Sequence, residues 1–406
     1  MTKQNVSENS VGPLVGVRVV EVANMWAGPM VGTILCHLGA QVTRVELPGK
    51  GDQMRSWPPL KGGLSLQFAR VNANKRSVGI DLRTSEGQGL ARRLAQKADV
   101  VVTSYRSPTL KSWGLDYPAL MALNPQTIVV AVSGFGQSGP YSERPGFGSI
   151  ADAVSGFAHI TGYASTPPTF ATFGLADQLA AISGALGAMT ALYRRQITGV
   201  GDLVDVAIYE PLMFVVGDAI VRYSATGEVT QREGDDRAGP TGARGIFEAQ
   251  DGKWLAIASS ADSMVPRLFK AIGRLALLDD PRFATNASRI ANASEVKALL
   301  RDWVASRPRS EALKNLIDHG VTAGAVNDAQ EIVDDPHFRD RTLVRVDSGQ
   351  AGQFTMPGYL FHLGSFSGIK HKNVPAVGEH TDRVLATELG LHKAEIERLR
   401  AAGVIG

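Results

Sequence analysis

Residues 16–46 read GVRVVEVANMWAGPMVGTILCHLGAQVTRVE and predict a strand, a helix and a second strand in succession. Residues 17–22 are rich in valine, which is typical of a strand. Residues 28–38 have helical character, and Gly39 provides the stop at which many helices end. Residues 42–46 then return to a β-branched pattern. The stretch therefore predicts a βαβ unit with two parallel strands.

The same alternation of strands and helices continues along the chain. We expect an amphipathic helix over residues 85–97 and strands over residues 100–102, 127–132 and 203–208. Strands that alternate with helices imply a mostly parallel sheet with right-handed crossovers. Residues 12–210 are therefore predicted to form an open, Rossmann-like α/β layer.

The composition changes near residues 232–237, a charged stretch (REGDDR) that we interpret as part of a linker. A smaller α+β domain is expected after it. Its strands are expected around residues 245–247 and 254–258, and its helices around residues 264–272, 295–305 and 309–319. The chain is accordingly divided into a disordered tail, a large domain, a linker, a small domain and a C-terminal return segment, at residues 1–11, 12–225, 226–238, 239–335 and 336–406.

Composition limits the classes of protein that the chain can represent. Its 406 residues suggest two or three domains, and 44% apolar content suffices for a substantial core. The net charge of +3, from 42 basic and 39 acidic residues, argues against a dedicated nucleic-acid binder. The single cysteine, Cys36, excludes an internal disulfide, and the histidines lack the spacing of metal ligands.

Nothing in the sequence predicts a secreted or membrane-spanning protein. Residues 1–11 are polar and lack the apolar core of a secretory signal. No stretch approaches the run of about 18 unbroken apolar residues that a spanning helix needs. The lone cysteine suits a reducing compartment. We therefore expect a soluble, cytoplasmic protein.

Asp177 ends the segment PTFATFGLAD, residues 168–177, and lies at the start of an alanine-rich helix that is expected to run to Arg195. Free amides and the helix dipole favour a charged carboxylate there, so its pKa is expected below the usual value of about 3.9. Two roles are open. Asp is a preferred helix cap, and an ionised carboxylate can also be a nucleophile.

Several other segments are expected at the ends of neighbouring strands, where open α/β sheets bind ligands. The turn at residues 24–29 (NMWAGP) lacks the G-x-G-x-x-G fingerprint, which argues against a nicotinamide dehydrogenase. Residues 74–76, residues 105–106 and Lys111 supply basic and aromatic side chains. These are either solvated surface or a set that holds an adenine nucleotide. The loop at residues 133–140 (SGFGQSGP) allows close backbone approach.

An ordered set of short segments links the chain to a known family. The segments are AGP at residues 27–29, NKRS at 74–77, SGFGQSGP at 133–140, AVSG at 153–156, Asp177 with its helix, and GEHTD at 378–382. In this order they resemble the family III CoA-transferases, or CaiB/BaiF family, which includes formyl-CoA transferase and carnitine CoA-transferase. The resemblance covers nearly the whole chain from Gly12 onward.

The resemblance implies that Asp177 is the nucleophile of a CoA-transferase. Such an enzyme moves CoA from an acyl-CoA to a carboxylic acid through covalent aspartyl anhydride and aspartyl-CoA intermediates. The family also implies an interlocked homodimer and a C-terminal segment that returns to the large domain. Its reaction needs CoA and no metal. From charge and hydropathy, no nucleic-acid or membrane partner is expected. The CoA-contacting positions that it implies are Met25, Trp26, Ala27, Leu47, Arg76, Ile80, Arg83, Ser104, Tyr105, Arg106, Lys111 and Phe147.

The chain departs from the family pattern at several positions. Leu47 stands where formyl-CoA transferase has a CoA-contacting arginine, and Ser112 occupies another basic position. Phe147 and Gly148 replace the His-Asp pair of the related α-methylacyl-CoA racemases. A racemase is therefore the second choice, because phenylalanine cannot act as a base. A non-catalytic subunit that binds CoA thioesters also stays open, although the presence of Asp177 argues against it.

These motifs do not define the donor and acceptor acids. Arg232, Arg237 and Arg244 are candidates to meet a second carboxylate if the acids are dicarboxylic, such as succinate. Surface charge explains each of these arginines equally well. Backbone amides near Asp177 and at residues 134–136 are candidate oxyanion donors.

Overall fold

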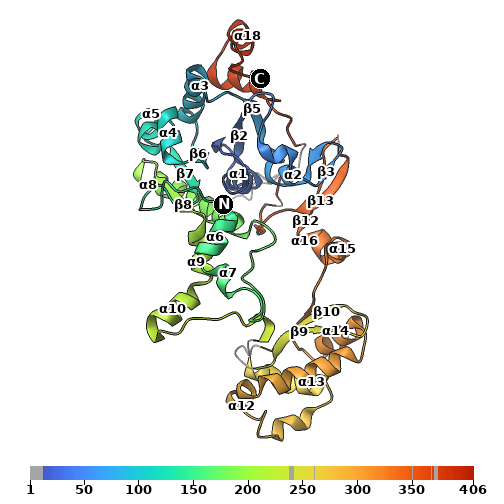
Figure 1. Cartoon of the computed structure of the whole chain (residues 1–406). Coiled ribbons are helices and arrows are strands. Elements are labelled where there is room, and N and C mark those ends of the chain that lie inside the picture. Colours follow the sequence, from blue (N-terminus) through green and yellow to red (C-terminus); the bar gives the residue numbers. More distant parts are fainter. Residues whose placement is uncertain (1–11, 237–241, 260, 350, 367, 370–373) are drawn as a thin grey trace, which may run out of the picture. The chain divides into compact units, whose positions relative to one another are not determined.

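The computed structural model describes residues 12–236, 242–259, 261–349, 351–366, 368–369 and 374–406 (Figure 1). These residues form two compact units. The first comprises the chain up to residue 158 together with residues 170–230 and 340–406, and the second comprises residues 159–169 and 231–339. The predicted tail and the end of the predicted linker lie outside the described residues.

The first unit is built on a six-stranded sheet in which all neighbouring strands are parallel. From edge to edge, its strands are β5 (Arg76–Gly79), β2 (Gln41–Glu46), β1 (Arg18–Val22), β6 (Val100–Thr103), β7 (Ile128–Ser133) and β8 (Leu203–Ala207). Counted in chain order within the sheet, the strands follow the order 3-2-1-4-5-6, which is that of doubly wound nucleotide-binding folds. The predicted α/β class and parallel sheet are confirmed.

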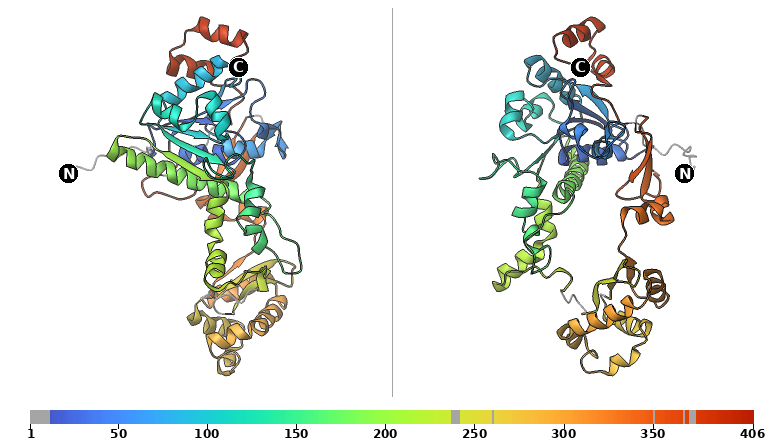
Figure 2. Two further views of the ribbon diagram at one scale, coloured as in Figure 1. Left: turned by 60° about the vertical axis from the view of Figure 1, so that its left-hand side comes forward. Right: turned by 45° about the vertical axis from the view of Figure 1, so that its right-hand side comes forward.

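Both faces of this sheet are covered by helices. Val100 and Val102 pack on the side of α1 (Ala27–His37) and α8 (Leu175–Thr198), the long green helix in the left view of Figure 2. Val101 points to the opposite face, as the alternation of a strand requires. Helices from distant parts of the chain cover that face, namely α3 (Ser85–Gln96), α17 (Thr381–Leu389) and α18 (Lys393–Ala401).

Helix α8 is long and apolar enough to cross a membrane, judged by length and composition alone. The packing of α8 in the first unit also explains that composition. Ala180 and Ala188 are buried in the core that α8 forms with α1 and the sheet. Gly187 lies so close to β8 that a Cβ atom there would be 2.3 Å from Cγ1 of Val204. The small residues on the buried face of α8 therefore serve close packing.

The second unit contains a three-stranded antiparallel sheet. Its strands are, in order, β11 (Ala323–Ala325), β10 (Trp254–Ala258) and β9 (Arg244–Glu248). Phe269 and Phe283 lie in the core of this unit. The three helices expected here are present close to their predicted bounds, as α11 (Val265–Ala271), α13 (Ala293–Ala305) and α14 (Arg309–Asp318).

Residues 159–169 differ from the predicted domain assignment, which placed them in the large domain. Arg232 donates a hydrogen bond from Nη1 to the carbonyl oxygen of His159 at 2.9 Å. A Cβ atom on Gly234 would lie 2.3 Å from the ring of Tyr163. Because these contacts join the stretch to the chain after residue 231, it belongs to the second unit. The other domain boundaries stay a prediction.

Shorter elements complete the two units. The strands are β3 (Leu60–Lys61), β4 (Leu64–Ser65), β12 (Leu343–Asp347) and β13 (Gln353–Pro357). The helices are α2 (Leu66–Asn72), α4 (Ser107–Trp113), α5 (Tyr117–Leu123), α6 (Gly148–Val154), α7 (Phe157–Ile160), α9 (Tyr209–Val215), α10 (Gly217–Thr226), α12 (Asn286–Ala291), α15 (Ala329–Asp334) and α16 (Pro336–Arg341).

Two glycine substitutions test the packing of α8 against the sheet. Gly187→Ala should lower the free energy of unfolding, because forced overpacking typically costs about 1–3 kcal/mol. Gly89→Ala is the matched control in α3, where the nearest atom to an added Cβ is Nη2 of Arg92 at 3.9 Å. That variant should gain roughly 0.5–1 kcal/mol from helix propensity. Thermal and denaturant unfolding measure both, and equal stabilisation of the two variants would contradict the packing described.

Candidate active site

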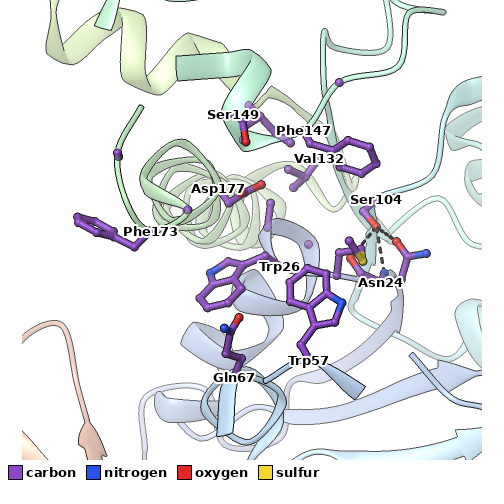
Figure 3. Close-up of a pocket in the computed structure, with 18 of the residues that line it drawn as sticks. Asn24, Trp26, Trp57, Gln67, Ser104, Val132, Phe147, Ser149, Phe173 and Asp177 are labelled. Atoms are coloured by element: carbon purple, nitrogen blue, oxygen red, sulfur yellow. Dashed lines mark hydrogen bonds between the residues drawn. The ribbon is translucent and has the colours of Figure 1, made fainter. Parts of the chain in front are cut away.

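A cavity of about 680 Å³ lies at the carboxyl edge of the parallel sheet. Strands β1 and β6 are neighbours at the centre of the sheet, where the strand order reverses, and ligand sites of doubly wound folds occur at this point. The cavity is lined by the turns that follow these strands, by the segments after β7, and by the starts of α6 and α8 (Figure 3). The sequence placed the ligand site at this edge.

Asp177 lies in this cavity, in the first turn of α8. The residue that caps the helix is Gly174, and no side chain caps it. The capping role considered for Asp177 is therefore wrong. Within the described part of the chain, no amide or side chain donates a hydrogen bond to its carboxylate, which leaves that group available to a ligand.

The expected pKa of Asp177 is also wrong in direction. Burial, and after it the nearby charge of Asp152, raise the pKa of this carboxyl to about 6. The helix dipole that should lower the pKa is present. However, removing a carboxylate from water disfavours its charged form, and here no hydrogen bond offsets that loss.

Asp152 is a member of the site that the sequence analysis missed. It lies in α6 and is only 3% exposed. Its Oδ2 accepts a hydrogen bond from the amide of Ala171 at 3.2 Å, whereas Oδ1 is buried without a partner among the described residues. Burial raises its pKa as well. A single acidic residue in the otherwise uncharged helix GSIADAV was the available signal.

Glycines bring the walls of the cavity close to the Asp177 carboxylate. A Cβ atom on Gly148 would lie 2.2 Å from Oδ2 of Asp177. Gly134 and Gly146 approach each other so closely that a Cβ atom on Gly134 would lie 2.6 Å from Cα of Gly146. The glycine-rich loop after β7 therefore packs against the segment that enters α6, and a side chain at Gly148 would displace the carboxylate.

A second cavity of about 590 Å³ opens at the same edge, around the ends of β1, β2, β5 and β6. Asn24 lines both cavities, so the two adjoin at the turn after β1. Lys50, which the sequence analysis did not single out, and Arg83 bring positive charge to the second cavity. The Arg83 guanidinium binds Asp81 at 2.6 Å and is 74% exposed.

The structure divides the predicted CoA-contacting residues into three groups. One group lines the cavity that contains Asp177, namely Met25, Trp26, Ala27, Ser104 and Phe147. Another lines the second cavity, namely Leu47, Ile80, Arg83 and Tyr105. The third lines neither cavity, namely Arg76, Arg106 and Lys111.

The structure argues against a role in ligand binding for the basic pair at residues 75 and 76. Arg76 begins β5, so it lies at the amino end of its strand, opposite the ligand edge. It forms an ion pair with Glu388 at 2.6 Å. Lys75 is fully buried and its Nζ binds Glu21 at 2.7 Å. Both the solvated-surface and the phosphate-binding interpretations are therefore wrong for Lys75.

The remaining predicted basic residues lie elsewhere. Arg106 donates from Nη1 to the carbonyl oxygen of Glu143 at 3.3 Å, and Lys111 is exposed on α4. Arg232 and Arg244 belong to the second unit. Arg237 lies outside the described residues. The basic residue that does line the Asp177 cavity is Arg70, which no motif indicated.

Comparisons with known proteins identify the family. Residues 14–381 match the family model described as CoA-transferase family III. The chain belongs to this family. The predicted resemblance and the enzyme class are therefore confirmed, and the CoA thioester is the substrate that this class of enzyme uses.

Relatives of this CoA-transferase span nearly its full length. It is 38% identical over 403 residues to succinyl-CoA–D-citramalate CoA-transferase of Chloroflexus aurantiacus, covering 98% of this chain and 100% of the relative. It is 33% identical to succinate–glutarate CoA-transferase of Agrobacterium fabrum, covering 93% and 96%. A CaiB/BaiF family protein from Brucella suis has the same fold, with a TM-score of 0.82, 32% identity, and coverage of 93% and 100%.

Replacing Asp152 tests the electrostatics of the CoA-transferase site. Asp152→Asn removes the neighbouring charge but keeps the burial, so the pKa of Asp177 should fall from about 6 toward its ordinary value. Carbon NMR of aspartate-labelled protein measures this pKa, with Asp177→Asn identifying the signal. Asp205→Asn, outside the cavity, is the control. An Asp177 pKa that stays near 6 in Asp152→Asn would show that Asp152 exerts no charge effect.

Proposed function

We propose that this enzyme moves CoA between acyl groups through covalent intermediates on Asp177. The observation that carries the proposal is the position of the Asp177 carboxylate. It lies in a cavity at the ligand edge of the sheet, without a hydrogen-bond donor in the described chain, and beside a second cavity that Lys50 and Arg83 line. This is the arrangement that a nucleophile facing the acyl end of a CoA thioester requires.

CoA would bind with its nucleotide in the second cavity and its thioester in the first. Lys50 and Arg83 line the second cavity and would meet phosphates, a role in which cations are common. The rings of Tyr105 and Trp113 lie there with their centroids 4.8 Å apart and offer apolar surface to the base. The thiol arm would then pass Asn24, which lines both cavities.

The first half of the reaction transfers CoA to the enzyme. Asp177 attacks the thioester carbonyl, the carbon–sulfur bond breaks, and CoA leaves as a thiolate, so that an anhydride joins Asp177 to the acyl group. The thiolate then attacks the Asp177 carbonyl carbon of that anhydride. This releases the donor acid as a carboxylate and leaves an aspartyl-CoA thioester.

The second half of the reaction transfers CoA to the acceptor. The acceptor carboxylate attacks the aspartyl-CoA thioester, which forms a second anhydride and releases the thiolate again. The thiolate attacks the acceptor carbonyl carbon, and the product thioester leaves with Asp177 restored as a carboxylate. Backbone amides of Gly134 and of the first turn of α8 are the candidate donors to the oxyanions.

The raised pKa of Asp177 suits this chemistry. With a pKa of about 6, roughly nine-tenths of the carboxylate is ionised at neutral pH. The same shift makes the carboxylate more basic than an ordinary aspartate, and catalytic groups work best with a pKa near the operating pH. Burial of Asp177 therefore strengthens the nucleophile without removing its charge.

An interlocked homodimer forms part of the proposal, because a single chain leaves large apolar side chains uncovered. On α8, Leu186, Tyr193 and Ile197 are 68%, 68% and 72% exposed. Phe214 on α9 is 88% exposed, and α10 buries none of its residues. Exposed apolar surface of this extent favours a partner. A monomeric mass in light scattering would contradict the dimer. The predicted domain boundaries and a cytoplasmic location also stay proposals.

The names of the relatives suggest dicarboxylic substrates. The two relatives described above are named for succinyl-CoA with D-citramalate and for succinate with glutarate. We therefore propose that this enzyme also exchanges CoA between dicarboxylic acids, with succinyl-CoA as a donor. The racemase alternative loses support, because Phe147 lines the cavity and no described residue that lines it is a histidine.

The proposal is tested by incubating the enzyme with several acyl-CoAs and a panel of carboxylic acids. Wild type should form new CoA thioesters, and Asp177→Ala should form none while it keeps its fold and its affinity for CoA. Asp382→Ala removes a carboxylate from the first turn of another helix, α17, and should retain activity. CoA exchange that persists in Asp177→Ala would show that another residue is the nucleophile.

A further inference from the structure

Arg70 is a cation in the cavity that contains Asp177, and none of the reaction steps above uses it. It lies on α2, on the face that also presents Leu66 and Gln67 to the cavity. Gln67, one turn before it, is drawn at this face in Figure 3. Among the described residues that line the cavity, Arg70 is the only lysine or arginine.

The Arg70 side chain is held in place from two sides. Its Nη2 donates a hydrogen bond to Oε1 of Gln178 at 2.6 Å. Its guanidinium carbon lies 5.6 Å from the centre of the Trp26 ring, within the range of a cation–π contact. Because Gln178 directly follows Asp177 in α8, the hydrogen bond keeps the guanidinium beside the turn that carries the nucleophile.

Arg70 differs from nearby arginines in having no carboxylate partner. Arg44 binds Asp52 at 2.7 Å, and Arg55 binds Glu46 at 2.6 Å. Within the described chain, no carboxylate oxygen lies within 4.0 Å of the Arg70 guanidinium. Burial lowers its pKa without an acid to oppose the shift, although arginine keeps its proton in proteins. A partly buried cation of this kind is stabilised by an anion that enters the cavity.

The chemistry of the reaction indicates which anion this is. The thioester that reaches Asp177 carries no charge at its carbonyl, and the reacting carboxylate of the acceptor is consumed at Asp177. A monocarboxylic acyl group therefore brings no anion to Arg70 once it is bound. A dicarboxylic acyl group brings a second carboxylate, which stays ionised through every step. Arg70 has four further N–H donors and can bind that carboxylate with two of them.

We propose that Arg70 binds the second carboxylate of a dicarboxylic acyl group and so selects dicarboxylic over monocarboxylic substrates. This inference rests on the proposed function, since it assumes that the acyl group lies in the cavity of Asp177. Arg70 would serve in both halves of the reaction, because the donor and acceptor acyl groups occupy the cavity in turn. Trp26 and Gln178 position the guanidinium.

The test compares succinyl-CoA with butyryl-CoA, which has the same chain length but a methyl group in place of the second carboxylate. Arg70→Gln should lower kcat/KM for succinyl-CoA by roughly ten- to a hundredfold, the usual effect of losing a charge-assisted hydrogen bond. The value for butyryl-CoA should stay unchanged or rise. Arg70→Lys should recover part of the loss, because it restores the charge without the paired donors.

Two controls separate specificity from folding and from the covalent mechanism. Arg398→Gln removes an exposed arginine that pairs with Glu86 and should leave both values unchanged. Asp177→Asn cannot turn over, so calorimetry on that variant measures binding alone. It should bind succinate more tightly than butyrate, and adding Arg70→Gln should abolish the difference. Melting curves of each variant report on the fold.

The outcomes distinguish this inference from the proposed function. Equal losses for succinyl-CoA and butyryl-CoA in Arg70→Gln would show that Arg70 acts on CoA or on the thioester, and would overturn the inference. Unchanged values for both substrates would overturn it as well. A further outcome is that Asp177→Ala remains active while Arg70→Gln loses activity with succinyl-CoA alone. In that case the assignment of Asp177 as nucleophile would be wrong, and the assignment of Arg70 as the carboxylate-binding residue would be supported.

Discussion

The ion pair between Arg44 and Asp52, 2.7 Å apart and almost wholly buried, holds the turn on which both cavities depend. Asp52 also accepts hydrogen bonds from the amides of Met25 at 3.0 Å and Met54 at 2.9 Å. Met25 adopts a positive φ of 62°, which is costly for a side chain other than glycine. The Asp52 carboxylate fixes this strained residue, and the turn directs Asn24 toward both cavities and Trp26 toward Arg70. Removing Arg44 would leave Asp52 buried without a cation, whereas removing Asp52 would leave Arg44 with Glu21 and Glu46 at 3.6 and 3.7 Å.

Around this turn, the site combines burial with unpaired charge. Asp177 and Asp152 lie in one cavity with Arg70, yet none of the three has an ion-pair partner in the described chain. A bound substrate can therefore supply charge partners for Asp177 and Arg70. A thioester carbon at Asp177 and a carboxylate at Arg70 would do so together. The same electrostatics explains both the raised pKa of the nucleophile and the proposed preference for dicarboxylic acids.

Much of the fold follows from local patterns in the sequence, because strand and helix periodicities repeat over short ranges. The parallel sheet, the helix that carries Asp177 and the ligand edge could all be predicted in this way. Burial could not, since it depends on distant segments. Lys75 reads as a surface cation, but Glu21 neutralises it from another strand at 2.7 Å. The helix dipole at Asp177 is visible in the sequence, whereas the burial that outweighs it is not. Asp152 and Arg70 belong to no motif, so only the assembled cavity identifies them.

The central claim is that the Asp177 carboxylate exchanges its own oxygen with the substrate in each turnover. The most direct measurement uses an acceptor acid with heavy oxygen in both carboxylate positions, together with unlabelled succinyl-CoA. When the thiolate opens the second anhydride at the acceptor carbonyl, the bridging heavy oxygen stays on Asp177. Mass spectrometry of the digested enzyme should find heavy oxygen in the peptide that contains Asp177 and in no other peptide. Product formation without label on Asp177, or label on a different residue, would contradict the covalent mechanism.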